Sequence, residues 1–325
     1  MKLLITGGAG YIGSATAEAL QHAGHQVTVY DSLITGHRKA VPVGCEFIQA
    51  DLANHETLSS VLRKGKFDAI YHFAAFIEAG ESMKDPGKYI QNNYVRTSEL
   101  IEQAVKHGVG KFIFSSTAAV YKSSDAPLTE ESTIEPANTY GFTKLAIEQT
   151  LEWYRRIFGL RYGVFRYFNA SGALPGRGEA HQPESHLIPR VIQVALGQAD
   201  EAQIYGTDYD TPDGTCIRDY IHIEDLVSAK LLGLSALADR DHFTYCLGSG
   251  TGYSVREVIS MIKEVSGVDF KVVEFPRRAG DAARLIASSE KIQRELGWIP
   301  VKGSLRDIIS SAWEWHSNHP HGYND

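Results

Sequence analysis

Three glycines at intervals of three residues, in the segment TGGAGYIG, restrict the possible fold more than any other feature of this sequence. They are Gly7, Gly10 and Gly13. The apolar run Leu3 to Thr6 comes before them, and the amphipathic stretch Ile12 to Ala23 begins among them. In a strand–turn–helix unit, such glycines let the backbone approach a pyrophosphate, which then lies at the free N–H groups of the helix N-terminus. The context predicts a dinucleotide-binding unit, although a glycine triplet alone also fits a structural turn.

Apolar runs and amphipathic stretches alternate over the first half of the chain. Runs that are apolar at both odd and even positions predict buried strands, and a period of about 3.6 residues predicts helices. The further strands predicted in this way are Val27–Tyr30, Ala69–Phe73, Phe112–Ser115 and Gly163–Tyr167, and the further helices are Glu56–Arg63, Pro86–Lys106 and Tyr140–Phe158. Alternation of this kind indicates an α/β fold with a doubly wound parallel sheet.

The pattern changes after Asn169, where a loop-like segment and shorter elements follow. Predicted there are helices at Leu187–Leu196, Glu224–Ala236 and Val255–Val265, and a strand at Phe270–Phe275. At roughly 100–200 residues a domain, a chain of 325 residues suggests two domains. We place them at residues 1–168 and 169–325, the second being smaller and of mixed α/β structure, with segments such as Phe243–Leu247 returning to the main sheet. The polar tail, residues 316–325, is expected to be frayed.

Composition argues against several classes of function. The net charge of −7 and the pI near 6 argue against a nucleic-acid partner, because such proteins carry a basic surface. The three cysteines, Cys45, Cys216 and Cys246, are widely spaced and form no CxxC motif, so we expect no disulfide and no metal. The chain has no apolar run of 18 residues and no signal-like N-terminus, so we expect no membrane partner and a cytoplasmic location.

The acidic residue Asp31, in VYDS at the end of the second predicted strand, sharpens the prediction of the ligand. It lies about 20 residues after the glycine turn, where a carboxylate accepts hydrogen bonds from the ribose hydroxyls of a dinucleotide. A carboxylate would also repel a 2′-phosphate, so the sequence favours NAD over NADP. Arg38 is near enough in the sequence to leave the second cofactor open.

A tyrosine and a lysine one helical turn apart, Tyr140 and Lys144 in TYGFTK, are candidates for catalysis. A free tyrosine has a pKa of about 10, but a neighbouring ammonium group and a cationic nicotinamide would both lower the pKa of the phenol. The hydroxyls of Ser115, Ser116 and Thr117 follow a predicted strand and would face the ligand crevice at the carboxyl end of the sheet. Each feature alone also fits an exposed helix face or a strand end that satisfies its own backbone.

Together, the glycine turn and the Tyr-x-x-x-Lys pair resemble the extended short-chain dehydrogenase/reductase family. The likeness covers almost the whole chain and is strongest to the members that epimerise UDP-hexoses. It is carried by TGGAGYIGS, HFAA, GESMKDPGKYIQNN, FSSTAAVY, TYGFTK, RYFNASGA, DGTCIRDYIHIEDL and RRAGD. This resemblance implies an NAD-binding Rossmann-like domain, a smaller UDP-sugar-binding domain, and a homodimer that packs helices near Pro86–Lys106 and Tyr140–Phe158.

The resemblance also implies roles for individual residues. It implies that Tyr140, Lys144 and Thr117 are catalytic. The implied cofactor-binding residues are Gly7, Gly10, Tyr11, Ile12, Gly13, Asp31, Asp51, Leu52, Phe73, Ala74, Ala75, Asn92, Ser115, Tyr140, Lys144 and Tyr167. The implied substrate-binding residues are Thr117, Asn169, His186, Leu187, Tyr205, Arg218, Arg278, Asp281 and Leu285. Arginine forks suit a diphosphate, although Arg218 beside Asp219 also fits an ordinary ion pair.

The activity implied by the resemblance is NAD-dependent conversion of UDP-galactose to UDP-glucose. Tyr140 takes the proton of the 4-hydroxyl with Thr117 bridging, hydride passes from carbon 4 to tightly bound NAD, the 4-keto sugar rotates, and hydride returns to its other face. Leu285 lies where some members have a bulky tyrosine, so we expect room for the 2-acetamido group of UDP-GalNAc and UDP-GlcNAc. The other departures from the family pattern are Ser32, Ile77, Lys122 and His186.

Two kinds of alternative stay open on the sequence. The nearest is another nucleotide-sugar epimerase or a 4,6-dehydratase of the same family, but dehydratases commonly carry acidic residues where this chain has Ala118 and Ala119. The alternative from another class is a non-catalytic NAD-sensing protein, which would be expected to lack Tyr140, Lys144 or Thr117.

Overall fold

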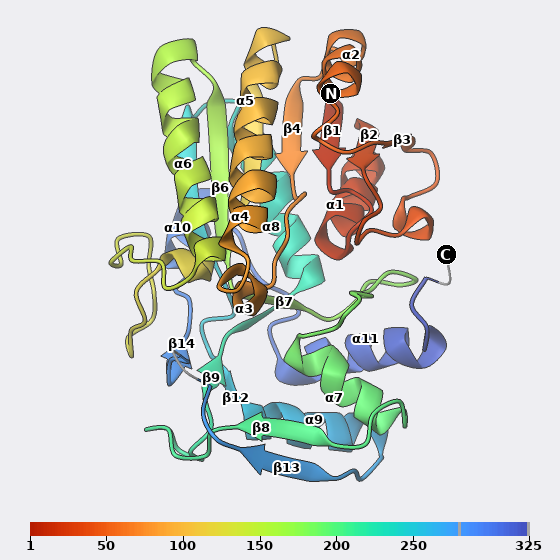
Figure 1. Cartoon of the computed structure of the whole chain (residues 1–325), viewed down its shortest axis with the longest axis vertical. Helices are drawn as coiled ribbons and strands as arrows, with labels where there is room; N and C mark the ends of the chain where they lie inside the picture. The colour runs from red at the N-terminus through yellow and green to blue at the C-terminus, as the bar shows by residue number, and fades with distance from the viewer. Residues whose placement is uncertain (279–280, 324–325) are drawn as a thin grey trace.

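The computed structural model describes residues 1–278 and 281–323 of the chain (Figure 1). Its centre is a seven-stranded sheet in the order β3-β2-β1-β4-β5-β6-β11, with every neighbouring pair parallel. The strands are β1 (Lys2–Thr6), β2 (Gln26–Asp31), β3 (Glu46–Gln49), β4 (Ala69–His72), β5 (Lys111–Thr117), β6 (Arg161–Tyr167) and β11 (His242–Leu247). The predicted doubly wound parallel sheet is confirmed, and β3 is an additional strand that the sequence analysis missed.

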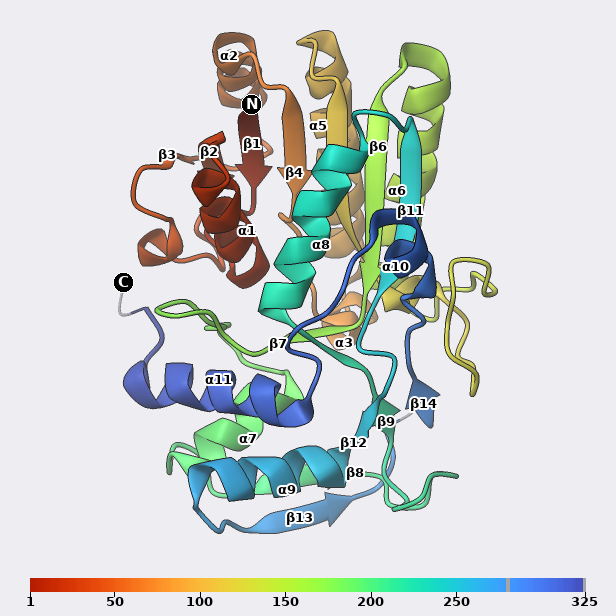
Figure 2. The same ribbon diagram turned by 180° about the vertical axis from the view of Figure 1, so that it is seen from behind.

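Helices cover both faces of this sheet, as the two opposite views show (Figures 1 and 2). One face carries α1 (Tyr11–His22), α8 (Ile223–Ala236) and α10 (Glu290–Leu296), and the other carries α2 (His55–Gly65), α5 (Arg96–Lys106) and α6 (Thr139–Phe158). Each layer has its own apolar core against the sheet, because the strands are buried on both sides. This burial explains why the strands are apolar at successive positions.

The helix predicted over residues 86–106 has a more complex form. It consists of α4 (Pro86–Tyr89), a π-helical segment (Ile90–Val95) and α5, which follow one another without a break. Asp85 caps the start by accepting a hydrogen bond from the backbone N–H of Lys88. Asn92, a predicted cofactor contact, lies in the π-helical segment, and such segments are frequent at functional sites.

Most of the remaining elements form a second layer below the carboxyl ends of the main strands (Figure 1). They are α7 (Leu187–Ala195), α9 (Val255–Ser266), α11 (Leu305–Asn318), β7 (Asn169–Ser171), β8 (Ala202–Tyr205), β9 (Ile217–Arg218), β10 (Tyr220–His222), β12 (Tyr253–Ser254), β13 (Val272–Phe275) and β14 (Arg284–Leu285). The short helix α3 (Ala79–Ser82) and the 3-10 turn Ala118–Val120 pack against α6 instead, and the 3-10 turn Arg38–Ala40 lies in the connection from β2 to β3. A third apolar core joins α7, α9 and α11 with the β8–β13 pair. Since β11 and α8 pack with the main sheet, the chain crosses between the two parts more than once.

The prediction of a frayed tail was wrong for residues 316–323. α11 continues to Asn318, and the ring of His319 stacks on Trp315 with 3.8 Å between centroids. The hydroxyl of Tyr323 donates to the carbonyl oxygen of Gly178 at 3.0 Å. These aromatic contacts offset the polarity of the tail. Residues 324 and 325 lie outside the described part of the chain.

The order of the strands fixes where a ligand can bind. From β1 the chain runs outward to β2 and β3, and from β4 it runs the other way to β5 and β6. The loops after β1 and β4 therefore diverge and leave a crevice at the carboxyl ends of these strands, which is where ligands bind in such sheets. Among the described residues, no helix is long and apolar enough to cross a membrane.

Candidate active site

The glycine turn forms the floor of a cavity of about 640 Å³ at this crevice. Gly7 has φ +73°, and a Cβ atom there would lie 2.4 Å from the backbone nitrogen of Ala74. A Cβ atom at Gly13 would lie 2.1 Å from the carbonyl oxygen of Gly7. Side chains are excluded at both positions, so backbone from two strands surrounds the N-terminus of α1. This close-packed cradle of N–H groups suits the pyrophosphate of a dinucleotide.

Asp31 is fixed in place at the end of β2. Its carboxylate accepts hydrogen bonds from the backbone N–H of Ala9 at 2.9 Å and from that of Leu33 at 2.8 Å. Burial raises the pKa of Asp31, and these two donors partly offset that effect. Arg38, which left NADP open, places its guanidinium 4.4 Å from the ring centroid of Phe47 and is not among the described residues that line the cavity. A carboxylate rather than a cation therefore lines the cavity where the ribose of a dinucleotide is expected.

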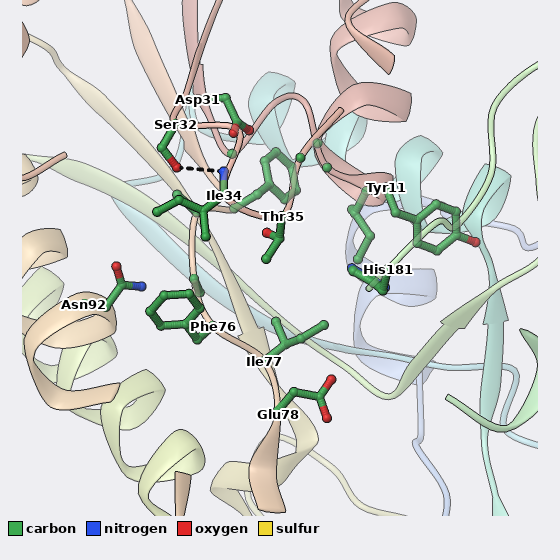
Figure 3. A pocket seen from close by; sticks show the side chains of 18 of the residues that line it. Tyr11, Asp31, Ser32, Ile34, Thr35, Phe76, Ile77, Glu78, Asn92 and His181 are labelled. Atoms are coloured by element: carbon green, nitrogen blue, oxygen red, sulfur yellow. Dashed lines mark hydrogen bonds between the residues drawn. The ribbon is translucent and has the colours of Figure 1, made fainter. Parts of the chain in front are cut away.

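The predicted cofactor residues that line the cavity come from the ends of five strands, β1, β2, β3, β4 and β6, and from α1, the π-helical segment and α6. Of the predicted cofactor residues, all except Ser115 line the cavity: Gly7, Gly10, Tyr11, Ile12, Gly13, Asp31, Asp51, Leu52, Phe73, Ala74, Ala75, Asn92, Tyr140, Lys144 and Tyr167. Figure 3 shows Asp31 and Ser32 at one side, Phe76, Ile77 and Glu78 along the wall, and Tyr11 beside His181. Ser115 lies behind the lining, where its hydroxyl is bonded to Tyr167.

The N-terminal turn of α6 brings Tyr140 and Lys144 to the end of β5. Asn138 caps this helix by accepting a hydrogen bond from the N–H of Gly141 at 2.8 Å. Lys144 is 3% exposed, and its Nζ donates to the carbonyl oxygen of Ser115 at 2.9 Å. The same Nζ lies 5.8 Å from the ring centroid of Tyr140, whose phenol is hydrogen-bonded to Thr117. The structure thus brings the three predicted catalytic residues together.

Burial has the largest influence on the pKa values of Tyr140 and Lys144. It raises the pKa of Tyr140 to about 12, with the hydrogen bond from Thr117 lowering the pKa and the charge of Glu78 raising it. It also lowers the pKa of Lys144 to about 7, against the attraction of Glu148. The protein groups therefore raise the pKa of the phenol, the opposite of the direction predicted from Lys144. The reason is burial of the phenol, which outweighs the hydrogen bond from Thr117.

A second buried lysine, Lys230 of α8, was missed by the sequence analysis. It is 0% exposed, and its Nζ lies 3.2 Å from the hydroxyl of Ser115. Rings of Phe73 and Tyr167 each have their centroids 4.9 Å from this nitrogen. Burial, with repulsion from Lys144, lowers the pKa of Lys230 to about 7. The signal in the sequence was a lone lysine in the otherwise apolar run SAKLLGL.

A buried ion pair supports Lys144 from below. Glu148, one turn along α6, pairs with Arg166 of β6 at 2.5 Å, and both side chains are less than a tenth exposed. The hydroxyls of Ser116 and Tyr121 are also bonded to this pair. The network ties α6 to β5 and β6 beneath the reacting groups, and it too was missed from sequence.

A second cavity of about 760 Å³ lies between the sheet and α7. Of the predicted substrate residues, those that line it are Asn169, His186, Leu187, Tyr205, Arg218, Arg278 and Asp281. The guanidinium of Arg278 lies 3.9 Å from the ring centroid of Tyr205, and Arg218 is 3.6 Å from Asp281. Two arginines and an acid on one wall can bind a diphosphate and a neighbouring hydroxyl.

Asp219 is not the ion-pair partner of Arg218. Its carboxylate instead accepts hydrogen bonds from the backbone N–H groups of Ser249, Gly250 and Ala287. The alternative of an ordinary pair between neighbouring residues is therefore wrong. Arg218 donates to the carbonyl oxygen of Ala282 at 2.9 Å, which leaves its guanidinium at the cavity wall.

Thr117 and Leu285 do not line this cavity. Thr117 lies at the end of β5, where it is hydrogen-bonded to Tyr140. The side chain of Leu285 packs, partly buried, against a small apolar cluster that includes Tyr121 and Cys246. These contacts are those of a packing residue and do not themselves show the room expected for a 2-acetamido group.

The two cavities adjoin. Ile77 and Glu78, in the segment after β4, line both of them (Figure 3). Glu78 also accepts a hydrogen bond from the hydroxyl of Ser185 at 2.8 Å. Tyr140 lines the first cavity and is close enough to Glu78 for that charge to raise the pKa of its phenol, so the reacting group lies near the junction of the two cavities. The sequence analysis noted Ile77 as a departure but overlooked Glu78.

Fold and site together define an NAD-binding α/β protein with a Tyr-Lys-Thr group at the carboxyl end of its sheet. The sequence matches the model of the NAD dependent epimerase/dehydratase family over residues 3–248. Because this match covers more than half of the chain, the protein belongs to that family and uses NAD.

Known proteins similar to this chain match it over nearly its whole length. A UDP-glucose 4-epimerase of Halalkalibacterium halodurans is 47% identical, over 99% of this chain and 98% of its own. A crystal structure of a UDP-glucose 4-epimerase is 47% identical, with a TM-score of 0.98 and full coverage of both chains. The UDP-Glc/GlcNAc 4-epimerase of Campylobacter jejuni is 40% identical, with a TM-score of 0.87 and coverage of 98% of this chain and 99% of that one.

Proposed function

We propose that this protein is a UDP-hexose 4-epimerase that converts UDP-galactose to UDP-glucose. The observation that carries the proposal is that Tyr140, hydrogen-bonded to Thr117, lines a dinucleotide cavity that adjoins a cavity with two arginines. The similar UDP-glucose 4-epimerases, which match this chain end to end, support the same activity. NAD would supply the acceptor and donor of hydride, and the residues of Figure 3 form its cavity.

The side chains divide the work as follows. The positive charges of Lys144 and of bound NAD would lower the pKa of Tyr140, and its phenolate would then accept the proton of the 4-hydroxyl while Thr117 holds that hydroxyl by a hydrogen bond. Lys144, fixed on the Ser115 carbonyl, provides the positive charge beside Tyr140 and a donor for a ribose hydroxyl. Arg218 and Arg278 hold the diphosphate, so the 4-keto sugar can rotate before Tyr140 returns the proton.

A product assay tests this activity. The purified protein is incubated with UDP-galactose without added NAD, and the nucleotide sugars are separated. We expect UDP-glucose, and the reverse reaction from UDP-glucose. A 4-keto-6-deoxy product would instead identify a 4,6-dehydratase. No product, even with NAD supplied, would favour a different nucleotide sugar, or a protein that binds NAD without catalysis.

The range of sugars is a separate part of the proposal. We infer that UDP-GalNAc and UDP-GlcNAc are also substrates, supported by a leucine at position 285 and by the similarity to a UDP-Glc/GlcNAc 4-epimerase. The packing of Leu285 against Tyr121 and Cys246 does not itself open the sugar cavity. Turnover of UDP-GalNAc should match that of UDP-galactose within about tenfold, and Leu285→Tyr should remove it selectively. Turnover of UDP-galactose alone by the wild type would refute this part.

We also propose a homodimer formed through α5 and α6. Phe142, Trp153 and Ile157 recur at helical spacing on α6, and each is more than half exposed. Apolar residues gathered on one exposed face mark an interface. Sedimentation should give twice the chain mass, and Trp153→Glu should give monomers, whereas Ile299→Glu, at an exposed site away from these helices, should not.

A cytoplasmic location is proposed on different grounds. All three cysteines are free thiols, two of them buried. Free buried thiols are typical of a reducing compartment. Fractionation of cells that express the protein would test this location.

A further inference from the structure

Four side chains able to bind a metal gather in one short segment, GEAHQPESH, between β7 and α7. They are Glu179, His181, Glu184 and His186. One ligand atom from each lies within 4.8 Å of the other three.

Several of these atoms lie at hydrogen-bonding distance, somewhat closer together than the ligands of a metal ion. Nδ1 of His181 and Nδ1 of His186 are each 2.9 Å from Oε1 of Glu179, and His186 Nδ1 is 2.8 Å from Oε1 of Glu184. Zn²⁺ binds such atoms at about 2.0–2.2 Å, which puts neighbouring ligands of a tetrahedron roughly 3.3 Å apart. Small rotations of the two imidazoles would admit the ion.

The two carboxylates of the cluster need positive charge to balance them. The carboxylates of Glu179 and Glu184 are 7% and 5% exposed, so two negative charges lie close together with little water. Either two protonated imidazoles or one divalent cation with neutral imidazoles can balance them. The side chains of His181 and His186 are 24% and 37% exposed, which gives an ion a path from solvent.

The surrounding protein holds the ligands in position. Oε1 of Glu184 accepts hydrogen bonds from the backbone N–H groups of Ser185 and His186, both at 2.8 Å. The carbonyl oxygen of Glu179 accepts one from the indole N–H of Trp315 at 3.1 Å. Contacts of this kind orient metal ligands and are part of most metal sites.

We propose that Glu179, His181, Glu184 and His186 bind one divalent transition-metal ion, with Zn²⁺ the best match to the ligand set. The segment lies against both cavities: His181 lines the first, and the other three line the second. The metal would therefore be structural and would fix the wall that the two cavities share. Sequence analysis predicted no metal because it considered only the cysteines. The proposal is independent of the sugar that the enzyme uses.

Metal binding to the tag-free holoenzyme tests the proposal. The protein is dialysed against ZnCl₂ and then against metal-free buffer, and zinc per chain is measured with a Kd from competition with a chelator. We expect one zinc per chain. His181→Gln and Glu184→Gln should each raise the Kd at least about tenfold, the lower end of the loss seen when only the outer shell of a metal site is altered. His55→Gln is the control, because its half-exposed ring lies beside Glu99 of α5.

A second measurement keeps the test independent of how the variants fold. Co²⁺ added to the wild-type protein should give the intense visible absorption of a four-coordinate site, and equimolar Zn²⁺ should abolish it. Zinc that is retained equally by wild type and by folded His181→Gln protein would overturn the proposal. So would a wild-type protein that retains no zinc and gives no cobalt spectrum, which would leave the cluster as paired imidazoliums and carboxylates.

Discussion

The two cavities of this protein are built in different ways. The first is formed by backbone and by buried side chains, with Asp31 only 8% and Lys144 only 3% exposed. The second depends on charged side chains at its wall, where Arg218 is 17% and Asp281 36% exposed. The strand ends of the main sheet thus determine the form of the first cavity. The form of the second cavity depends on side chains that can change rotamer.

This difference matches two different tasks. A cofactor that must stay bound through many turnovers is best held by groups that cannot move, since a preorganised site loses little entropy on binding. A sugar that must turn over within its site needs a firm hold on the diphosphate and a loose one on the hexose. The predictions below test the contrast between a fixed cofactor cavity and an adaptable substrate cavity.

The largest effect is expected where the two cavities meet. Tyr140→Phe removes the proton acceptor but keeps the ring, so kcat should fall by roughly 10²–10⁴-fold. Bound NAD, measured by absorbance after denaturation, should be unchanged because the cavity walls are intact. A fall in activity of less than tenfold would mean that another group moves the proton, which would contradict the role proposed for Tyr140.

The next largest effect is expected on the free energy of unfolding when the buried ion pair beside the first cavity is broken. Glu148→Gln leaves the guanidinium of Arg166 buried without its partner charge, which should lower the free energy of unfolding by about 3–5 kcal/mol. Glu152→Gln, on the same helix but 25% exposed, should cost about 1 kcal/mol or less. Urea titration of both variants measures the difference. Equal losses of unfolding free energy in the two variants would show that the buried pair stabilises the protein no more than the exposed one.

Substitutions in the second cavity are expected to change the affinity for the substrate. Arg278→Lys loses the flat guanidinium over Tyr205 and its two-pronged contact, so KM should rise about 10- to 100-fold with little change in kcat. Arg277→Lys is the adjacent control, since that guanidinium lies over Tyr209 and pairs with Asp208. Similar kinetics for the two variants would place the diphosphate elsewhere.

The smallest effect is a pH dependence of stability in the buried region. The pKa of Lys230 is about 7 in the folded protein and higher when unfolded, so between these values only the unfolded chain holds the proton. The stability of the wild type therefore rises with pH above about 7, by up to about 1.4 kcal/mol per pH unit relative to Lys230→Met. The variant should be the more stable at pH 7, with an advantage that shrinks by pH 9. Urea unfolding at pH 7, 8 and 9 should show this, and a constant difference would contradict it.

Short-range patterns predicted the first cavity well. The glycine spacing, Asp31 at a strand end, and the pair Tyr140 and Lys144 each depend on residues within one turn or one loop. Their geometry is set by the local backbone and needs little from distant segments. The residues that only the family resemblance implied, among them Asp51, Asn92 and Tyr167, line the same cavity.

Long-range packing accounts for what could not be predicted. β3 was missed because only Phe47 and Ile48 are apolar in a strand at the edge of the sheet. Lys230 approaches Ser115 from a helix more than a hundred residues away, so no local pattern joins them. The direction in which the pKa of Tyr140 shifts depends on how deeply the phenol is buried. The packing of Leu285 against Tyr121 likewise depends on the folded chain and not on the local sequence.

The hydrogen bonds of Asp31 have a consequence for redesign of cofactor choice. Its two carboxylate oxygens secure the turn at Ala9 and the loop at Leu33, besides facing the ribose. A designer who exchanged Asp31 for a smaller neutral residue to admit NADP would also release both loops. Selectivity and loop order would change in a single step, so a successful redesign must supply new acceptors for the N–H groups of Ala9 and Leu33.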